Sequence, residues 1–325
     1  MAVAVGGRFR ADSLGADGWF RVLVWVTVAS VYAMLVLGGV VRVTESGLGC
    51  GDDWPLCAGQ WLPPLESKAI IEYAHRVAAS FLVGPLIVAT FICAWLRYRR
   101  EPWIIWPAAI AVVLVIIQAL LGGLTVTTEL SGHVVMTHLA VAELTLACCV
   151  LLAVMAHRGG MRDSPATWAV GKTRLFPPLA MAAAVALFLL ILSGSYLTNT
   201  ASATWACNQW PLCTNEWGGV FPGGKLALIH MVHRYVALVA GLFIIYALHL
   251  GFRGRMQPSV IRLLAMAALA LFAAQVLAGA GMIWAGFGQD VEVRALHLAL
   301  ASGVWGVMVA LVTLTYSRES RKSDL

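Results

Sequence analysis

Four histidines in apolar surroundings are the residues of this sequence best suited to chemistry: His75, His138, His233 and His297. Ionisable side chains inside a membrane are costly, so they indicate function rather than packing. Their spacing repeats, because His75 and His233 are 158 residues apart and the other two are 159 apart. Neutral imidazole is a ligand for zinc, copper and haem iron. The four side chains therefore predict a metal or haem site in each of two related halves.

Other landmarks repeat at nearly the same distance. Two pairs are 157 residues apart: Cys50 with Cys207, and Gln118 with Gln275. The segments 72–76 and 230–234 both end in His-Arg and both open a long apolar run. The near-constant offset indicates a duplicated unit. The halves differ at one ionisable position, since Glu72 of the first half corresponds to His230 of the second.

Composition indicates that the elements holding these residues lie in a membrane. The chain is 60% hydrophobic and 12% charged, with a mean hydropathy of +0.83, and soluble domains carry about twice that charged fraction. A bilayer crossing needs about 20 apolar residues. Eight segments qualify, at about residues 21–43, 69–96, 103–127, 132–156, 175–198, 225–250, 260–286 and 293–316. We predict an all-α integral membrane protein whose eight transmembrane helices form two tandem pseudo-symmetric four-helix bundles.

The domain boundaries follow from these spans. An N-terminal bundle is predicted over residues 21–157 and a C-terminal bundle over 175–316, with a leader at 1–20, a linker at 158–174 and a tail at 317–325. Most of the 22 basic residues fall in the leader, linker and tail and in the loops on their side of the membrane. The positive-inside rule therefore places both termini in the cytoplasm of a multi-pass cell-membrane protein. The net charge of +6 reflects this topology and gives no support for nucleic-acid binding.

Four of the seven cysteines lie in the two large loops predicted to be outside the cell: Cys50, Cys57, Cys207 and Cys213. Cysteines facing an oxidising compartment tend to form disulfides. Structural disulfides are one interpretation, and a redox-active pair that passes reducing equivalents to a buried site is the other. A zinc site outside the membrane is disfavoured, because four thiolates would have to converge from separate halves.

The four histidines are expected to share one level of the membrane. They lie on spans that run inward, roughly 6–12 Å below the outer surface at the helical rise. Haem with two imidazole ligands needs one histidine from each of two helices. Small residues on neighbouring spans would leave room for a porphyrin: Gly122, Gly123, Gly279 and Gly281. Arg76 and Arg234 are suitably placed for propionate carboxylates. Zinc stays an alternative, with Glu72 and His230 as further ligands.

Glu72 lies on the same helical face as His75, about one turn towards the outside. A buried carboxyl beside a haem could move protons or stabilise positive charge at a reacting carbon. Alternatively, it only hydrogen-bonds His75 or an interfacial arginine. Its absence from the second half indicates a catalytic first half and a permanent haem in the second. Glu143 lies deeper, and we expect it to pair with a polar neighbour such as Gln118 or to belong to a proton path.

In order and spacing, the sequence resembles the haem A synthase family, membrane enzymes that oxidise a methyl group of haem O to the formyl group of haem A. The resemblance covers the chain except for the leader. It rests on residues 38–44, 46–50 and 53–57, on Glu72-x-x-His75-Arg76, on Gln118 with 122–126, on 137–139, on the second cysteine loop, on His233-Arg234 and on 296–298.

The resemblance implies a role for each matching residue. It implies that His75 and His138 ligate the substrate haem O and that His233 and His297 ligate a haem b cofactor. Glu72 matches the proposed catalytic acid of the family. The two disulfides of the family match Cys50 with Cys57 and Cys207 with Cys213. His230 has no role to carry over.

The implied reaction makes the protein an oxidoreductase. Successive hydroxylations would give a geminal diol, which loses water to leave the aldehyde. Haem O synthase, assembly factors of terminal oxidases and an unidentified electron donor are the implied partners. The alternative is a di-haem membrane cytochrome b that only transfers electrons, which would leave Glu72 and the cysteine loops unused. A transporter is disfavoured, because the halves share one orientation and lack broken spans.

Overall fold

The computed structural model describes residues 18–157, 176–200, 203–213, 224–253, 259–284 and 290–319, and within them the regular elements are all helical. The first half contains α1 (Gly18–Val43), α2 (Ser67–Val77), the π-helix η1 (Ala78–Val83), α3 (Gly84–Tyr98), α4 (Pro102–Thr127) and α5 (Gly132–His157). The second contains α6 (Phe176–Asn199), the short η3 (Ala203–Trp205), α7 (Lys225–Arg253), α8 (Ser259–Trp284) and α9 (Val291–Glu319).

Eight helices in these ranges are long and apolar enough to cross a membrane, with α2, η1 and α3 forming one continuous span of 32 residues. The prediction of an all-α protein with eight transmembrane helices is confirmed. The π-helix in the second span was not predicted. Proline has no N–H to donate to the preceding turn, and Pro85 is the second residue after the wide turn. Such wide turns are frequent at functional sites, and this one begins three residues after His75.

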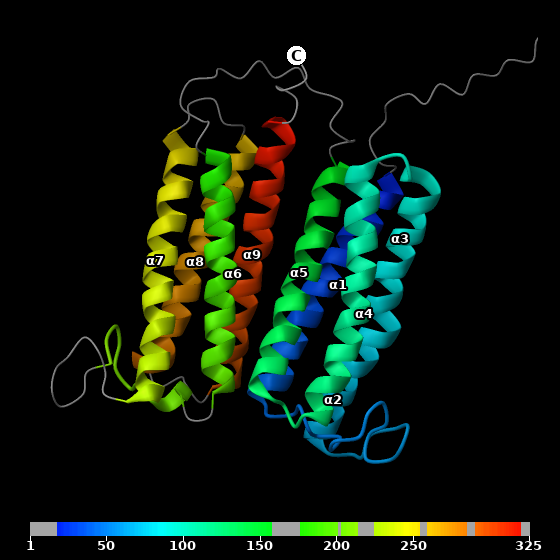
Figure 1. The fold of residues 1–325 in the computed structure, drawn as a ribbon, viewed down its shortest axis with the longest axis vertical. Coiled ribbons are helices and arrows are strands. Elements are labelled where there is room, and N and C mark those ends of the chain that lie inside the picture. Colours follow the sequence, from blue (N-terminus) through cyan, green and yellow to red (C-terminus); the bar gives the residue numbers. More distant parts are fainter. Residues whose placement is uncertain are drawn as a thin grey trace, which may run out of the picture.

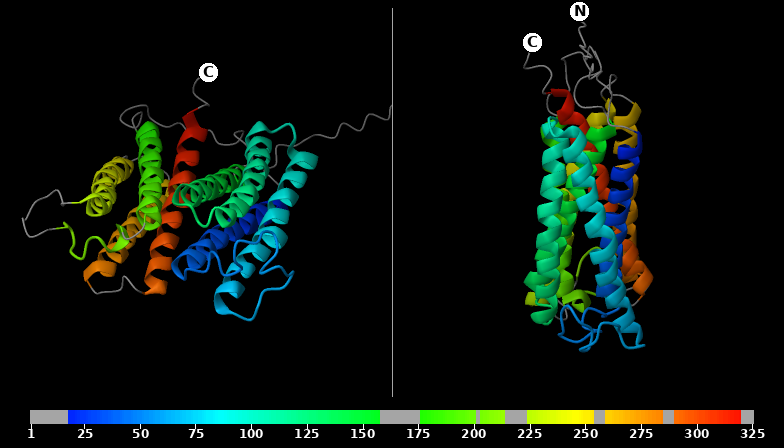
Figure 2. Two further views of the ribbon diagram at one scale, coloured as in Figure 1. Left: turned by 60° about the horizontal axis from the view of Figure 1, so that its bottom comes forward. Right: turned by 90° about the vertical axis from the view of Figure 1, so that its right-hand side faces the viewer.

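The two halves stand side by side as two groups of roughly parallel helices (Figure 1). The contacts between them are made by α5 with α9, α1 with α9 and α5 with α6, and the views in Figure 2 show α9 beside α5. A single cluster of buried apolar side chains runs through both halves. The halves therefore share one core, while their pseudo-symmetry stays a prediction.

A buried carboxyl joins the halves. Glu143 on α5 is 0% exposed, and its Oε1 accepts a hydrogen bond of 2.6 Å from the hydroxyl of Ser302 on α9. The indole N–H of Trp305 donates to the main-chain oxygen of Glu143 at 2.9 Å. The expected pairing with Gln118 is wrong, because Glu143 lies on the face of α5 that is turned towards α9.

The cysteine loops of both halves lie at the same end of the molecule, at the bottom of Figure 1. We call this the disulfide end, since the loops contain the disulfides Cys50–Cys57 and Cys207–Cys213. Most of the predicted leader, linker and tail falls outside the described residues. The side of the membrane that the disulfide end faces stays a prediction.

Candidate functional site

A cavity of about 1510 Å³ extends through both halves and reaches the loops of the disulfide end. Its walls are mostly apolar side chains. All four histidines singled out from the sequence line it: His75, His138, His233 and His297. The sequence predicted one haem site in each half, and the histidine pairs of both halves line this same cavity.

The histidines are paired within each half. His75 comes from α2 and His138 from α5, and the two side chains are close enough to interact electrostatically. His233 comes from α7 and His297 from α9, and they interact in the same way. Each half therefore presents two imidazoles from two different helices to the cavity. This is the donor set that a haem with two axial histidines requires.

In the first half each imidazole packs against a glycine of a neighbouring helix. A β-carbon built on Gly38 of α1 would lie 3.2 Å from Cε1 of His75, and one built on Gly122 of α4 would lie 3.6 Å from Cε1 of His138. Gly123, which was also predicted to make room for a porphyrin, instead packs against the indole of Trp54, at 3.1 Å from its built β-carbon.

The second half repeats this packing. The β-carbon built on Gly194 of α6 would lie 3.1 Å from Cε1 of His233, and that on Gly279 of α8 would lie 3.1 Å from Cε1 of His297. Contacts this short leave no free room for a methyl group beside the ring. The absence of a side chain at these positions thus sets where each imidazole lies. Gly38 and Gly194 were not singled out from the sequence, because their contacts depend on how the helices pack.

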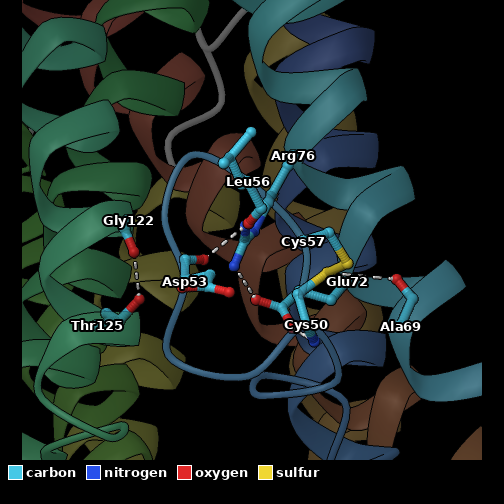
Figure 3. A network of polar contacts seen from close by, with 9 residues as sticks. All are labelled: Cys50, Asp53, Leu56, Cys57, Ala69, Glu72, Arg76, Gly122 and Thr125. Atoms are coloured by element: carbon cyan, nitrogen blue, oxygen red, sulfur yellow. Dashed lines mark hydrogen bonds and ion pairs between the residues drawn. A yellow bond between two sulfur atoms is a disulfide. The ribbon is translucent and has the colours of Figure 1, made fainter. Parts of the chain in front are cut away.

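Glu72 joins α2 to the first disulfide loop. It is 2% exposed, its Oε2 accepts the main-chain N–H of Cys50 at 2.8 Å, and its Oε1 accepts a hydrogen bond from Arg76 at 2.6 Å. Arg76 also donates to the main-chain oxygens of Leu56 at 2.7 Å and Asp53 at 3.1 Å (Figure 3). Both carboxylate oxygens of Glu72 are engaged, and Glu72 and Arg76 still line the cavity.

The second half has the same arginine clamp without the acid. Arg234 donates to the main-chain oxygens of Gln209 at 2.6 Å and Pro211 at 3.1 Å. Its Nη2 lies 3.3 Å from Nε2 of His230, which occupies the place of the carboxylate. Among the described residues no carboxylate forms an ion pair with Arg234.

Two further arginines line the cavity where the halves meet. Arg42 at the end of α1 donates to Oδ1 of Asn199 at 3.0 Å and to the main-chain oxygen of Thr198 at 2.7 Å, both at the end of α6. Arg294 on α9 donates to the main-chain oxygen of Val43 at 3.4 Å. Sequence reasoning missed both arginines. The signal for them was present, because they are basic residues on the side of the membrane that is otherwise poor in them.

These residues fit haem better than zinc. Within the described part of the chain, no three His, Cys, Asp or Glu side chains form a group that could hold a metal ion. The four thiolates of the disulfide end are consumed in disulfides. Paired imidazoles in an apolar cavity that arginines also line match an apolar macrocycle that carries two carboxylates.

Comparison with known proteins gives the family. Residues 21–309 match the COX15-CtaA family, which is described as a cytochrome oxidase assembly protein. The chain belongs to the COX15-CtaA family. The match includes both helical halves and all four cavity histidines.

Curated relatives extend over the same region. A protein named heme A synthase from Alkalihalophilus pseudofirmus is 30% identical over 301 residues, which is 90% of this chain and 98% of the relative. The heme A synthase of Bacillus licheniformis is 27% identical over 299 residues, 91% of this chain and 97% of the relative. That of Halalkalibacterium halodurans is 32% identical over 227 residues, 68% and 73% of the two chains. This COX15-CtaA protein therefore aligns with two of these heme A synthases over 90% and 91% of its length.

Proposed function

We propose that this COX15-CtaA protein is a haem A synthase, which oxidises a methyl group of haem O to a formyl group. One observation carries the proposal: two pairs of buried imidazoles, each ring packed against a glycine, line one apolar cavity. His75 and His138 would hold the substrate haem O in the first half. His233 and His297 would hold a haem b cofactor in the second. The relatives are named heme A synthase, which supports the proposed activity.

The haem b iron, when bound, supplies one-electron redox chemistry. The residues of the chain bind and orient the two macrocycles. The glycine contacts fix the imidazole rings, and the arginines at the disulfide end offer cations to propionate carboxylates. Arg76 has N–H groups beyond those it gives to Glu72 and the loop, and Arg234 has no acidic partner among the described residues.

Glu72 would be the acid of the first half. Arg76 and the N–H of Cys50 hold its carboxylate in one position at the edge of the cavity. A fixed carboxylate can orient water or stabilise positive charge that develops at the reacting methyl carbon. Two hydroxylations of that carbon give a geminal diol, and loss of water from it leaves the aldehyde. The oxidant and the electron donor come from outside the chain.

The setting of the reaction follows from the charge pattern. Both termini would face the cytoplasm, and the disulfide end would face the outside of the cell membrane. Haem O synthase would supply the substrate, and assembly factors of terminal oxidases would take the product.

Pigment analysis tests the proposal. The chain is expressed in cells that make haem O but no haem A, and the haems of the membranes are extracted, separated and weighed by mass spectrometry. We expect haem A and its hydroxylated precursor in cells with the parent chain, and haem O alone in cells with the His138→Ala variant. Haem O alone with the parent chain, despite a normal haem b spectrum, would instead identify a di-haem electron carrier.

A further inference from the structure

Of the four cavity histidines, His233 is the one whose Nδ1 contacts a hydrogen-bonding side chain. The hydroxyl oxygen of Ser193 on α6 lies 2.8 Å from Nδ1 of His233 on α7. The same hydroxyl donates to the main-chain oxygen of Leu190 at 2.7 Å. Ser193 directly precedes Gly194, the glycine against which the His233 ring packs. The ring is therefore held on one face by packing and at one nitrogen by a hydrogen bond.

The two bonds of Ser193 determine which nitrogen of His233 carries the proton. A hydroxyl has one proton, and the Leu190 carbonyl can only accept it. With the hydroxyl proton on the Leu190 carbonyl, the hydroxyl oxygen accepts the hydrogen bond from Nδ1–H of His233. Nε2 is left with its lone pair, which is the group that binds iron.

The partner histidine is held at its other nitrogen, because the buried Nδ1 of His297 has no hydrogen-bond partner. The amide nitrogen of Gln275 lies 3.2 Å from Nε2 of His297. An amide NH₂ group can only donate, so Nε2 of His297 accepts this hydrogen bond with its lone pair. In the second half, His233 thus presents Nε2 as a free ligand nitrogen, whereas Nε2 of His297 has to exchange its hydrogen bond with Gln275 for the iron.

The first half lacks the hydroxyl. His75 packs against Gly38 as His233 packs against Gly194, but the residue before Gly38 is Leu37. A leucine side chain neither donates nor accepts. In the described part of the chain, the buried Nδ1 atoms of His75 and His138 have no hydrogen-bond partner. No hydrogen bond there fixes the protonated nitrogen of either ring.

The charges beside the two arginines also favour tighter haem binding in the second half. Arg76 is neutralised by Glu72 at 2.6 Å, whereas Arg234 faces His230 at 3.3 Å. An imidazole nitrogen that accepts a guanidinium N–H is uncharged. The second half therefore keeps a net cation at the cavity, and attraction between opposite charges is strong where water is scarce. A carboxylate of a bound haem would be held more strongly there.

We infer that Ser193 is the positioning residue that makes the second half a permanent haem site, and that Leu37 at the matching place leaves the first half able to exchange its haem. The inference rests on the proposed function, because it assumes one haem between each histidine pair. Groups that orient a metal-binding histidine also make it a stronger donor. A stronger donor favours ferric over ferrous iron, so Ser193 lowers the reduction potential of the haem as well as its rate of loss.

The test uses the full chain, purified with its haem b. Haem transfer to excess apomyoglobin gives the rate of loss, and a redox titration gives the midpoint potential. Ser193→Ala removes the hydroxyl, Ser193→Thr keeps one, and Leu37→Ser introduces one in the first half. The matched control is Thr313→Val on α9, which removes a hydroxyl that donates to the main-chain oxygen of Val309 at 2.8 Å.

We expect Ser193→Ala to lose haem b about 10- to 100-fold faster than the parent, with a higher midpoint potential. Ser193→Thr and the control should stay close to the parent, and Leu37→Ser should slow exchange of a haem added to the first half. A Ser193→Ala variant with parental rate and potential would overturn the inference. So would faster loss at an unchanged potential, because packing alone would explain that result.

A further variant distinguishes failure of this inference from failure of the proposed function. His233→Ala should abolish the haem b spectrum. If the parent and His233→Ala have the same spectrum, the haem site itself is assigned wrongly. If His233→Ala loses the spectrum while Ser193→Ala behaves as the parent, the site stands and only the role of Ser193 is refuted.

Discussion

The guanidinium of Arg76 lies 2.6 Å from the carboxylate of Glu72, whose other oxygen accepts the main-chain N–H of Cys50 at 2.8 Å. This buried acid therefore connects helix α2 to the first disulfide loop. Glu72 lies three residues before His75 and four before Arg76. Glu72 has two roles in this account: it is the proposed acid of the reaction, and it holds the disulfide loop. A useful substitution removes the first role and keeps the second.

Glu72→Gln is the separating substitution, because glutamine keeps the shape and an oxygen that can accept the N–H of Cys50. It removes the charge. We expect the variant to bind both haems and to lose formyl production by about 100-fold or more, the usual contribution of a positioned acid or base. Extracted haems, measured by chromatography and mass, give the result.

Glu66→Gln is the matched control, since Glu66 is an exposed acid at the start of the same helix and its side chain makes no capping hydrogen bond. It should produce haem A at the parental level. Parental haem A formation by Glu72→Gln would limit Glu72 to holding the loop.

Gly38→Ala tests the packing of the imidazoles. The new methyl group would lie 3.2 Å from Cε1 of His75, so the ring has to move. The shift amounts to a few tenths of an ångström, so the loss should be smaller than the roughly 100-fold that a misplacement of about 1 Å can cause. We expect a changed low-spin ferric signal in electron paramagnetic resonance from the haem of the first half, together with reduced haem A formation.

Gly306→Ala on α9 is the control, because the nearest atoms to its new methyl group would lie 4.0 Å away. Alanine also favours helix over glycine by about 1 kcal/mol, so this variant should be at least as stable as the parent. A parental spectrum and parental activity in Gly38→Ala would show that the ring position is not set by this glycine.

Ser302→Ala tests the junction of the halves. The buried Oε1 of Glu143 loses its hydroxyl donor, and a buried polar atom left without a partner costs about 1–3 kcal/mol. The free energy of unfolding should fall by that amount in detergent. Thr313→Val on the same helix removes a hydroxyl that bonds only within the helix, and it should change stability less. Equal losses in the two variants would mean that the hydrogen bond to Glu143 stabilises the protein no more than a hydrogen bond within one helix.

The fold was predictable because long apolar runs are a strong signal. The second span was predicted at 69–96 and is found at Ser67–Tyr98. The π-helix within it was not predicted, since apolar periodicity does not show which turn widens. The partner of Glu143 was predicted wrongly for a related reason. Which face of α5 meets the other half depends on packing between bundles, and hydrophobicity on all sides of a helix conceals that face.

The sequence identified the four histidines of the site, but it did not predict the contacts that orient their rings. Their matched depth follows from sequence spacing and helical rise. The contacts that orient the rings join distant residues: Ser193 and His233 are 40 positions apart, and Gly38 lies on a different helix from His75. Gly122 and Gly279 were recognised as room for a porphyrin, whereas their contact with the imidazole rings required the packed structure.

The haems bound to purified His138→Ala and His297→Ala test the central claim most directly. The claim is that substrate lies between the histidines of the first half and the cofactor between those of the second. We predict that His138→Ala keeps haem b and forms no haem A, and that His297→Ala loses the haem b spectrum. Loss of haem b from His138→Ala, with haem A still formed by His297→Ala at the parental rate, would contradict the account.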